Sequence, residues 1–400
     1  MGKDLFLDGK SIIKKIEEAN EEAYFVGGCV RDLLLKRHIK DIDIATSASP
    51  EQIQQIFTKV IPVGIEHGTV IVRYNHHSYE VTTFRIDGEY SNKRHPDHVQ
   101  FIHSIDEDLK RRDFTINALA MDKDGNIIDL FCGRKDLQSK TIRTVGDGYK
   151  RFSEDALRMV RAIRFSSQLG FMIEEETLKN IIRLKENIQS VAIERITNEF
   201  TKLFAGKYVH TGIYYLRKTK IYEYLPIFSK NPSIIHQLPT FKQPLHSFGE
   251  VIVLLHHIEP TIPIRTWVNE WKCSNQIKRE AIELENALTY YEKYGLDQWL
   301  VYQLSDSYYE GFLRLLNIFY PDDSLTLYQI KQIDKQLPIH SKQDLAIKGT
   351  DILDAYPHVQ KGPWIRKMLE KIEKKVVFQK INNNKYDLKE WMKCNPPEIN

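Results

Sequence analysis

The chain has 400 residues, enough for two or three domains and a substantial buried core. Its 42% hydrophobic and 28% charged residues are ordinary for a folded protein and exclude a disordered chain or a coiled-coil rod. The 57 basic and 54 acidic side chains leave a formal net charge of +3, so any site for a polyanion must be local.

The four cysteines, Cys29, Cys132, Cys273 and Cys394, lie far apart and form no CxxC pair. Neither a structural zinc site nor a disulfide framework is expected, and the sequence favours a cytoplasmic location. The longest apolar run, Val251 to Leu255, is far shorter than the roughly 18 residues that a membrane span needs, so no membrane segment is predicted.

The first part of the chain begins with a mixture of helical and strand-like segments. A helix is predicted over 11–20, and an apolar strand over 23–26 runs into Gly27-Gly28. Alternating charged and apolar residues predict a strand over 41–46. The run Ser49-Pro50-Glu51-Gln52 is a capping box with proline at the first helical position, so a helix is expected to begin there.

More strands are predicted before residue 140. The segments 69–74 and 79–84 flank a short polar turn and predict a hairpin, and further strands are predicted over 99–102 and 126–131. The segment 87–97 is polar and contains Gly and Pro. Its apolar residues follow neither the helical nor the strand periodicity, so it is expected to be a mobile loop.

After about residue 140 the apolar spacing becomes helical, which marks a domain boundary. The predicted helices run from a cap at 153–155 to Gly170, over 174–189, over 192–205, and along an amphipathic stripe over 365–376.

Two aspartates, Asp41 and Asp43, stand two positions apart in a predicted strand. Side chains so placed point to the same face, with Cα atoms about 6.5 to 7 Å apart, and can hold divalent ions for two-metal phosphoryl transfer. Taken alone, two aspartates in this pattern are explained at least as well as exposed residues at the edge of a surface strand.

The glycine pair strengthens the case for a nucleotide site. Gly28 begins a predicted helix, so backbone N–H groups can approach a triphosphate, and Arg31 one turn later adds a charged donor. Glu80, on a strand predicted to run beside the strand of the two aspartates, is the candidate third carboxylate. The alternative is that Glu80 is an exposed glutamate on a strand with no role in the chemistry.

Arginines recur in two later motifs. One is Arg111-Arg112-Asp113, and the other contains Asp155, Arg158, Arg161 and Arg164 on one predicted helix. A salt bridge on a solvated face explains a single Asp–Arg pair. Three arginines beside one acid favour a nucleotide or polyphosphate ligand.

The spacing of Asp155 and Arg158 has a chemical consequence. Cytosine and adenine each present a ring acceptor beside an amine donor, which an Arg donor and an Asp acceptor satisfy together. Uracil and guanine present a ring N–H beside a carbonyl, and each unsatisfied polar group costs about 1 to 3 kcal/mol. One fixed pair of side chains can therefore select C and A over U and G.

Four segments together resemble a known family. YFVGGCVRDLLLKRHIKDIDIAT, DGEYSNKRHPDHVQF, RRDFTINALAMD and EDALRMVRAIRF are similar to the motifs of class II tRNA nucleotidyltransferases, the CCA-adding enzymes. IKGTDIL and KGPWIRKMLEKI resemble the C-terminal part of Gram-positive bacterial members. Lys36 and His38 depart from the commonest pattern, on a turn where no effect on the chemistry is expected.

The resemblance implies an α+β chain. An N-terminal nucleotidyltransferase-type mixed sheet with helices, the head, would occupy 1–145. An all-α neck over 146–210, body over 211–295 and tail over 296–400 would follow, with base recognition in the neck and tRNA binding in the tail.

The resemblance also implies site residues and a reaction. Asp41 and Asp43 match metal ligands for Mg²⁺, and Glu80 is kept beside them as a catalytic carboxylate. The matched nucleotide-binding residues are Gly28, Arg31, Arg112, Asp155, Arg158, Arg161 and Arg164. The enzyme would add C, C and A to the 3′ end of tRNA from CTP and ATP without a nucleic-acid template.

Two alternatives stay open. A bacterial poly(A) polymerase shares the head and neck motifs, and a non-catalytic protein on the same scaffold would bind tRNA without extending it. Basic clusters at 217–220 and 366–375 are candidate tRNA contacts, with solvated helix faces as the alternative. The oligomeric state is undecided, a homodimer included.

Overall fold

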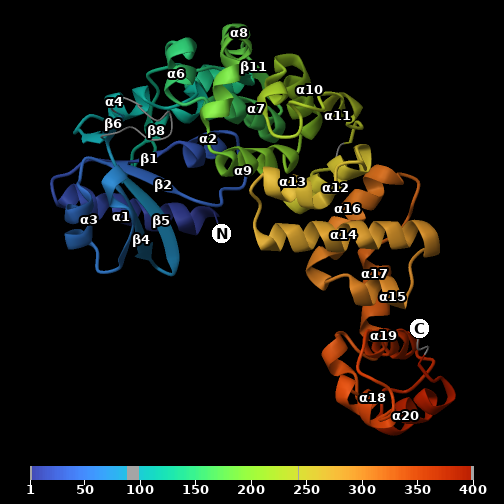
Figure 1. The fold of residues 1–400 in the computed structure, drawn as a ribbon. Coiled ribbons are helices and arrows are strands. Elements are labelled where there is room, and N and C mark those ends of the chain that lie inside the picture. Colours follow the sequence, from blue (N-terminus) through green and yellow to red (C-terminus); the bar gives the residue numbers. More distant parts are fainter. Residues whose placement is uncertain (1, 88–98, 242, 398–400) are drawn as a thin grey trace. The chain divides into compact units, whose positions relative to one another are not determined.

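The computed structural model describes residues 2–87, 99–241 and 243–397 (Figure 1). The chain divides into two compact units, one formed by 1–244 with 270–272 and the other by 245–269 with 273–400. The four-part division at 145, 210 and 295 stays a prediction. The expected loop over 87–97 lies, except for its first residue, outside the described residues.

A seven-stranded mixed sheet lies in the N-terminal part of the first unit, in the order β3-β4-β5-β2-β1-β8-β9. Its strands are β1 (Ala23–Val26), β2 (Asp43–Thr46), β3 (Val60–Gly64), β4 (Thr69–Tyr74), β5 (His77–Thr83), β8 (Ala120–Met121) and β9 (Ile127–Ile128). β2 and β5 run parallel, and the other neighbours run antiparallel. Two small ladders pair β6 (Arg85–Asp87) with β7 (Val99–Phe101), and β10 (Thr141–Ile142) with β11 (Met172–Ile173).

Helices dominate the rest of the chain. The first unit contains α1 (Gly2–Glu18), α2 (Gly28–Leu34), α3 (Pro50–Ile56), α4 (Ile105–Lys110), α5 (Gly133–Gln138), α6 (Gly148–Glu154), α7 (Leu157–Leu169), α8 (Glu175–Leu184), α9 (Ile193–Phe204), α10 (Val209–Thr219) and α11 (Ser233–Gln237). Then follow α12 (Phe248–Ile258), α13 (Ile264–Glu270), α14 (Asn275–Tyr294), α15 (Gln298–Gln303), α16 (Tyr309–Phe319), α17 (Leu327–Gln336), α18 (Gly349–Ala355), α19 (Trp364–Val377) and α20 (Lys385–Cys394). The predicted α+β class is confirmed.

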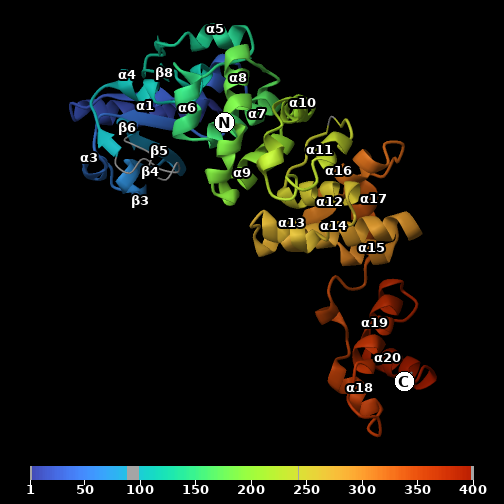
Figure 2. The ribbon, with the colours of Figure 1, turned by 45° about the horizontal axis from the view of Figure 1, so that its top comes forward.

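In the first unit, α7 packs against both α9 and α10, as Figures 1 and 2 show. No helix in the described ranges is both long enough and apolar enough to cross a membrane.

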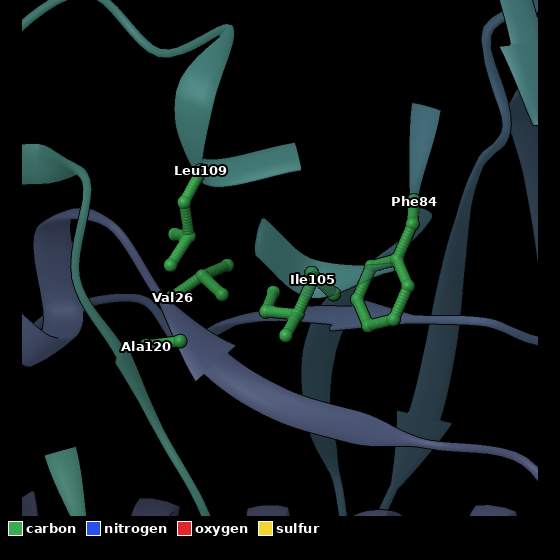
Figure 3. Packing of buried hydrophobic residues seen from close by; sticks show 6 residues of the cluster. Val26, Phe84, Ile105, Leu109 and Ala120 are labelled. Carbon is green, nitrogen blue, oxygen red and sulfur yellow. The ribbon is translucent and has the colours of Figure 1, made fainter. Parts of the chain in front are cut away.

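The two faces of the large sheet are covered by different helices. On one face, Phe6 of α1 packs edge-on against Phe25 of β1, with ring centroids 5.0 Å apart. On the other face, side chains of the sheet and of α4 form the buried cluster Val26, Ala45, Phe84, Ile105, Leu109 and Ala120 (Figure 3). Asp43 precedes Ala45 by two positions on β2, so its side chain lies on this second face.

Local signals placed several elements correctly. The helix predicted at Pro50 is confirmed: the Ser49 hydroxyl accepts from the Gln52 N–H at 3.3 Å, and the Gln52 side chain accepts from the Ser49 N–H at 2.7 Å. The hairpin of β4 and β5 is also confirmed, with a turn tighter than predicted. It turns at Asn75 and His76, whose φ angles are 44° and 68°.

The strand predicted over 99–102 is confirmed as β7, which ends at Phe101 and pairs with β6 outside the large sheet. The strand predicted over 126–131 was too long, because only Ile127–Ile128 form a strand. β3 and β8 were missed. β3 contains Pro62 and ends on Gly64, both poor strand formers, and β8 is only two residues long.

The predicted cap at 153–155 was also wrong. Ser153 and Glu154 end α6, whereas Asp155 has an extended backbone with φ −139° and ψ 103°. Its Oδ1 accepts from the Leu157 N–H at 3.0 Å, and α7 begins at that residue. Asp155 therefore lies between two helices and does not share a helical face with Arg158.

Candidate active site

A cavity of about 500 Å³ opens on the sheet face that carries Asp43, and all its lining residues belong to the first unit. Its ionisable side chains are Arg31, Arg85, Arg111, Arg112, Arg158, Arg161, Arg195, Asp43, Glu80, Asp108, Asp113 and Asp155. Arginines outnumber carboxylates, and both kinds gather where β1, β2, β5, α2 and α7 meet. The cavity suits an anionic ligand that also has hydrogen-bond donors and acceptors for these side chains to bind.

The glycine pair forms one wall of this cavity. Gly27 has φ +68°, and a Cβ on it would lie 2.9 Å from Nη1 of Arg112. Only glycine fits this position without strain and without displacing that guanidinium. α2 begins at Gly28, so its first backbone N–H groups, which have no partner within the helix, lie beside the cavity.

Arg31 is fixed at the cavity wall by two partners. Its Nη1 donates to Oδ1 of Asn117 at 2.7 Å, and its Nε and Nη2 donate to Asp32 at 3.0 and 2.9 Å. The Arg31 side chain is only 11% exposed. The predicted triphosphate donor is therefore held in place before a ligand arrives.

The carboxylates meet at the parallel pair of strands. Asp43 of β2 is the register partner of Glu80 of β5, which confirms the predicted strand adjacency, and both line the cavity. Burial, and then the negative charges of Glu80 and Asp41, raise the pKa of Asp43 to about 6, against the lowering effect of Arg112 and Arg31.

Asp41 lies just before β2, because the strand begins at Asp43 and not at 41 as predicted. Asp41 is exposed and lines a neighbouring cavity of about 480 Å³, to which Asp43 also contributes. In the described part of the chain, no three His, Cys, Asp or Glu side chains are arranged to hold a metal ion together. Glu80 thus lies next to Asp43 in the sheet without forming a three-ligand cluster with the two aspartates.

The Arg-Arg-Asp motif is organised by a buried acid. Arg111 and Arg112 pair with Asp108 at 2.8 and 3.1 Å, and these two cations lower the pKa of Asp108 although its burial acts in the opposite direction. Nε of Arg112 is buried and has no hydrogen-bond partner among the described residues. A buried guanidinium N–H of this kind suits an anionic ligand in the adjoining cavity.

Arg161 is bound to a buried carboxylate. Its Nε donates to Oδ2 of Asp113 at 2.7 Å, while Oδ1 of Asp113 accepts from the Phe114 N–H and from the Asn117 amide. Burial acts to raise the pKa of Asp113, but Arg161 and the Asn117 amide hold it at about 2. Asp113 is thus a permanent anion that orients Arg161 at the cavity wall.

Asp155 and Arg158 both line the cavity, and each is held by a different partner. Oδ2 of Asp155 accepts from Nη2 of Arg195 at 2.9 Å. Nη1 of Arg158 donates to Glu154 at 3.0 Å and to the backbone carbonyl of Arg151 at 3.2 Å. The two side chains therefore line the same cavity, and each is held in position by its own partners.

Arg164 is the one predicted nucleotide-binding side chain outside this cavity lining. It is buried, pairs with Glu199 and lies over the ring of Phe165 at 3.8 Å from the centroid. The same ring contacts the guanidinium groups of Arg31 and Arg161, at 5.3 and 5.4 Å, and lines the cavity. Arg164 thus borders the site from behind Phe165.

Sequence reasoning missed two residues of α9 that hold the site together. Arg195 fixes Asp155, and Glu199, which is 5% exposed, lies 3.7 Å from Arg161 and also pairs with Arg164. A usable signal existed, because the two residues are four positions apart in the helix predicted over 192–205 and so share one face.

A glycine turn, carboxylates on adjacent parallel strands and an arginine-lined cavity on a mixed sheet define a nucleotidyltransferase. Residues 23–143 match the family described as Poly A polymerase head domain. Residues 170–231 match the probable RNA and SrmB-binding site of polymerase A, and residues 250–392 match the putative tRNA nucleotidyltransferase domain 2.

Comparison with whole proteins is more specific. The chain is 49% identical to the CCA-adding enzyme of Oceanobacillus iheyensis over 398 residues, which are 99% of each chain. It is 40% identical to that of Anoxybacillus flavithermus over 401 residues, 99% of this chain and 98% of the relative. The crystal structure of the Bacillus stearothermophilus CCA-adding enzyme in complex with CTP is 35% identical with a TM-score of 0.86, covering 98% of this chain and 97% of that one. The chain belongs to the CCA-adding enzyme family of tRNA nucleotidyltransferases.

Proposed function

We propose that this chain adds C, C and A in turn to the 3′ end of tRNA, from CTP and ATP, without a nucleic-acid template. In each step the terminal 3′ oxygen forms a bond to the α-phosphorus of the nucleotide, and the bond from that phosphorus to pyrophosphate breaks. The observation that carries the proposal is that Asp155 and Arg158 line the same cavity as Gly28 and Asp43. Base-reading groups and phosphate-transfer groups thus border one space.

The triphosphate lies, in this proposal, against Gly28, Arg31 and Arg112. The N-terminal N–H groups of α2 supply partial positive charge, and the two guanidinium groups supply charge-assisted hydrogen bonds. The buried Nε of Arg112 then gains the partner that it lacks among the described residues. Arg161 completes the positive wall, and Arg164 supports it from behind Phe165.

A divalent cation fits the carboxylates of Asp41 and Asp43, and we propose Mg²⁺. Carboxylate oxygens suit this hard cation, which binds through one or two carboxylates and completes its shell with water and substrate phosphate. When bound, the ion lowers the pKa of the attacking hydroxyl and neutralises charge on the leaving pyrophosphate. Glu80 remains the proposed third carboxylate.

Asp155 and Arg158 are proposed to read the base. Each Asp155 oxygen accepts one hydrogen bond from the chain, and a carboxylate oxygen can accept two. Arg158 uses three of its five N–H groups on partners in the described ranges, which leaves Nε–H and one Nη2–H for a ligand. A donor and an acceptor thus remain for the edge that cytosine and adenine share.

The full-length relatives support CCA addition over a poly(A) polymerase. The polymerase family descriptions match 23–143 and 170–231, whereas the relatives that span nearly the whole chain are CCA-adding enzymes. A non-catalytic tRNA-binding protein would have no use for the carboxylates and the glycine turn beside the arginines.

The test uses tRNA that lacks its three 3′-terminal nucleotides, with labelled CTP and ATP and Mg²⁺. The expected product is three nucleotides longer and requires both nucleotides. Asp41→Ala and Asp43→Ala are expected to abolish transfer, and Arg158→Ala to change the base that is accepted. Arg279→Ala is the control and is expected to have no effect, because this side chain on α14 is 70% exposed. A long tract from ATP alone would indicate a poly(A) polymerase, and binding without extension would indicate the non-catalytic alternative.

A further inference from the structure

The neighbouring cavity of about 480 Å³ that Asp41 lines has no role in the proposed function. This second cavity shares Gly28, Arg31 and Asp43 with the candidate active site, whereas Asp41 lines only the second cavity. All its lining residues belong to the first unit. The two aspartates thus stand at the boundary between two spaces, and the proposed function fills only one of them.

Three segments that are far apart in the sequence form the second cavity. They are the connection 37–41 between α2 and β2, residues 168–169 at the end of α7, and residues 205–207 between α9 and α10. Nη1 of Arg37 donates to the backbone carbonyl of Gln168 at 3.2 Å, which joins the first segment to the second.

The third segment is packed closely on α7. A Cβ on Gly206 would lie 2.0 Å from the hydroxyl oxygen of Ser167. The Tyr208 N–H donates to the backbone carbonyl of the same serine at 2.8 Å. Lys207 lies between these two contacts, so its backbone is fixed beside the cavity while its side chain is exposed.

The charge of the second cavity is positive once its carboxylates are accounted for. Asp32 pairs with Arg31 at 2.9 Å, and the other two carboxylates are the proposed ligands of a divalent cation, which would offset their charge. Lys40 and Lys207 are exposed and form no ion pair with a carboxylate among the described residues. The basic residues of the lining are Arg31, Arg37, His38, Lys40 and Lys207. Such a space attracts a small polyanion.

The residues that border only one cavity give the nucleotide a direction. Asp155 and Arg158, the proposed base-reading pair, line only the first cavity, whereas Arg31, a proposed triphosphate ligand, lines both. The base then lies in the first cavity and the phosphates lie towards the shared wall. In an in-line displacement the leaving group departs on the side opposite the attacking oxygen. The second cavity is therefore the space beyond the phosphate end of the nucleotide.

The lining of the second cavity suits an inorganic anion better than an RNA strand. Among the described residues, none that lines it is Phe, Tyr or Trp, and its apolar members are Cys29, Ile39, Leu169 and Ala205. Proteins that hold single-stranded RNA stack its bases on aromatic rings. Pyrophosphate has no base or sugar, and lysine ammonium groups bind its oxygens as point charges.

We propose that the second cavity receives the pyrophosphate released at each addition, with Lys40 and Lys207 binding its oxygens. The bond from the α-phosphorus to the bridging oxygen breaks, and that oxygen keeps the electron pair and leaves as part of pyrophosphate. This inference rests on the proposed function, because that function makes pyrophosphate the product.

The test compares two double variants of the full-length protein. Lys40→Ala/Lys207→Ala removes two cations of the second cavity, and Lys202→Ala/Lys230→Ala removes two exposed cations of the same unit outside both cavities. Inhibition of CTP incorporation by added inorganic pyrophosphate is measured at saturating tRNA, and binding of magnesium pyrophosphate is measured by calorimetry. Thermal unfolding shows that both variants are folded.

The cavity variant is expected to raise the Ki for pyrophosphate about fivefold or more, as the loss of two exposed charge contacts would. The KM for CTP should stay within about twofold of wild type, because the incoming triphosphate is held by Arg31 and Arg112. Calorimetry should show the same weakening, and the control should match wild type in both measurements. Lys207→Ala alone should also raise the Ki, which separates a pyrophosphate contact from an effect of Lys40 on its neighbour Asp41.

The outcomes separate this inference from the proposed function. If wild type extends tRNA and pyrophosphate inhibits the cavity variant as strongly as wild type, the cavity is not the release site. If the KM for CTP rises in proportion to the Ki, the lysines bind the incoming triphosphate and the proposal is overturned. If tRNA affinity falls while the Ki is unchanged, the cavity serves the RNA strand and the proposal is also overturned. If wild type extends nothing yet the cavity variant alone loses pyrophosphate binding in the calorimeter, the anion site stands and the proposed function fails.

Discussion

Replacing Asp43 with asparagine is expected to stabilise the metal-free protein while it abolishes nucleotide transfer. The ordinary pKa of an aspartate, 3.8, rises to about 6 in the folded chain. Between these two pH values the folded state holds a proton that the unfolded state has released, so the free energy of unfolding falls as the pH rises through this window. At about 1.36 kcal/mol per pKa unit, ionised Asp43 costs about 3 kcal/mol at pH 7.

The assay is thermal unfolding with a chelator present, from pH 4.5 to 7.5, for wild type, Asp43→Asn and Glu66→Gln. For a domain of 150 to 250 residues, about 3 kcal/mol corresponds to roughly 6 to 12 °C, so the difference between Asp43→Asn and wild type should grow to that size by pH 7. Glu66, whose side chain is 85% exposed, is the matched control and should change little. A difference that does not depend on pH, or an asparagine variant less stable than wild type at pH 7, would refute the reasoning.

Three further substitutions test the site and the packing of the first unit. Gly27→Ala is expected to lower kcat/KM for CTP at least about tenfold in a folded protein, because the left-handed backbone and the adjacent guanidinium both oppose a Cβ. Arg195→Ala releases one Asp155 oxygen and is expected to raise incorporation of UTP relative to CTP, measured by primer extension with each nucleotide alone. If the UTP to CTP ratio is unchanged, Arg195 does not position Asp155. Gly206→Ala places a Cβ 2.0 Å from the Ser167 hydroxyl oxygen, so urea unfolding should show a loss of about 1 to 3 kcal/mol, and a loss below 0.5 kcal/mol would contradict this packing.

The sequence was most informative where a short local signal decides the structure. The capping box at Ser49 defined a helix start because both partners lie within four residues. The placement of Glu80 beside Asp43 followed from alternation on two apolar strands, which specifies the face of a residue once strands are adjacent. Gly28 and Arg158, which the family resemblance assigned to one nucleotide site, line the same cavity.

What the sequence could not supply depends on contacts between distant segments. Asp155 was expected on the helix, but it lies before α7, where its carboxylate accepts from the Leu157 N–H and binds Arg195, a residue 40 positions away. Arg164 was expected at the nucleotide, but Glu199 draws it into the interior. Helical periodicity shows which residues share a face. It does not show which residue of another helix will form an ion pair with a given side chain.

Phe165 carries a consequence for how the site tolerates its own charge. Three guanidinium groups, those of Arg31, Arg161 and Arg164, surround one benzyl ring, and two of them come from its own helix while Arg31 comes from α2. The electron-rich faces of an aromatic ring attract cations, so the ring lowers the repulsion among like charges crowded together. An aliphatic side chain of similar bulk would fill the space and lose this shielding. Phe165 therefore adds to the carboxylate partners of these arginines, Asp32, Asp113 and Glu199, in holding three cations close together before a substrate brings negative charge.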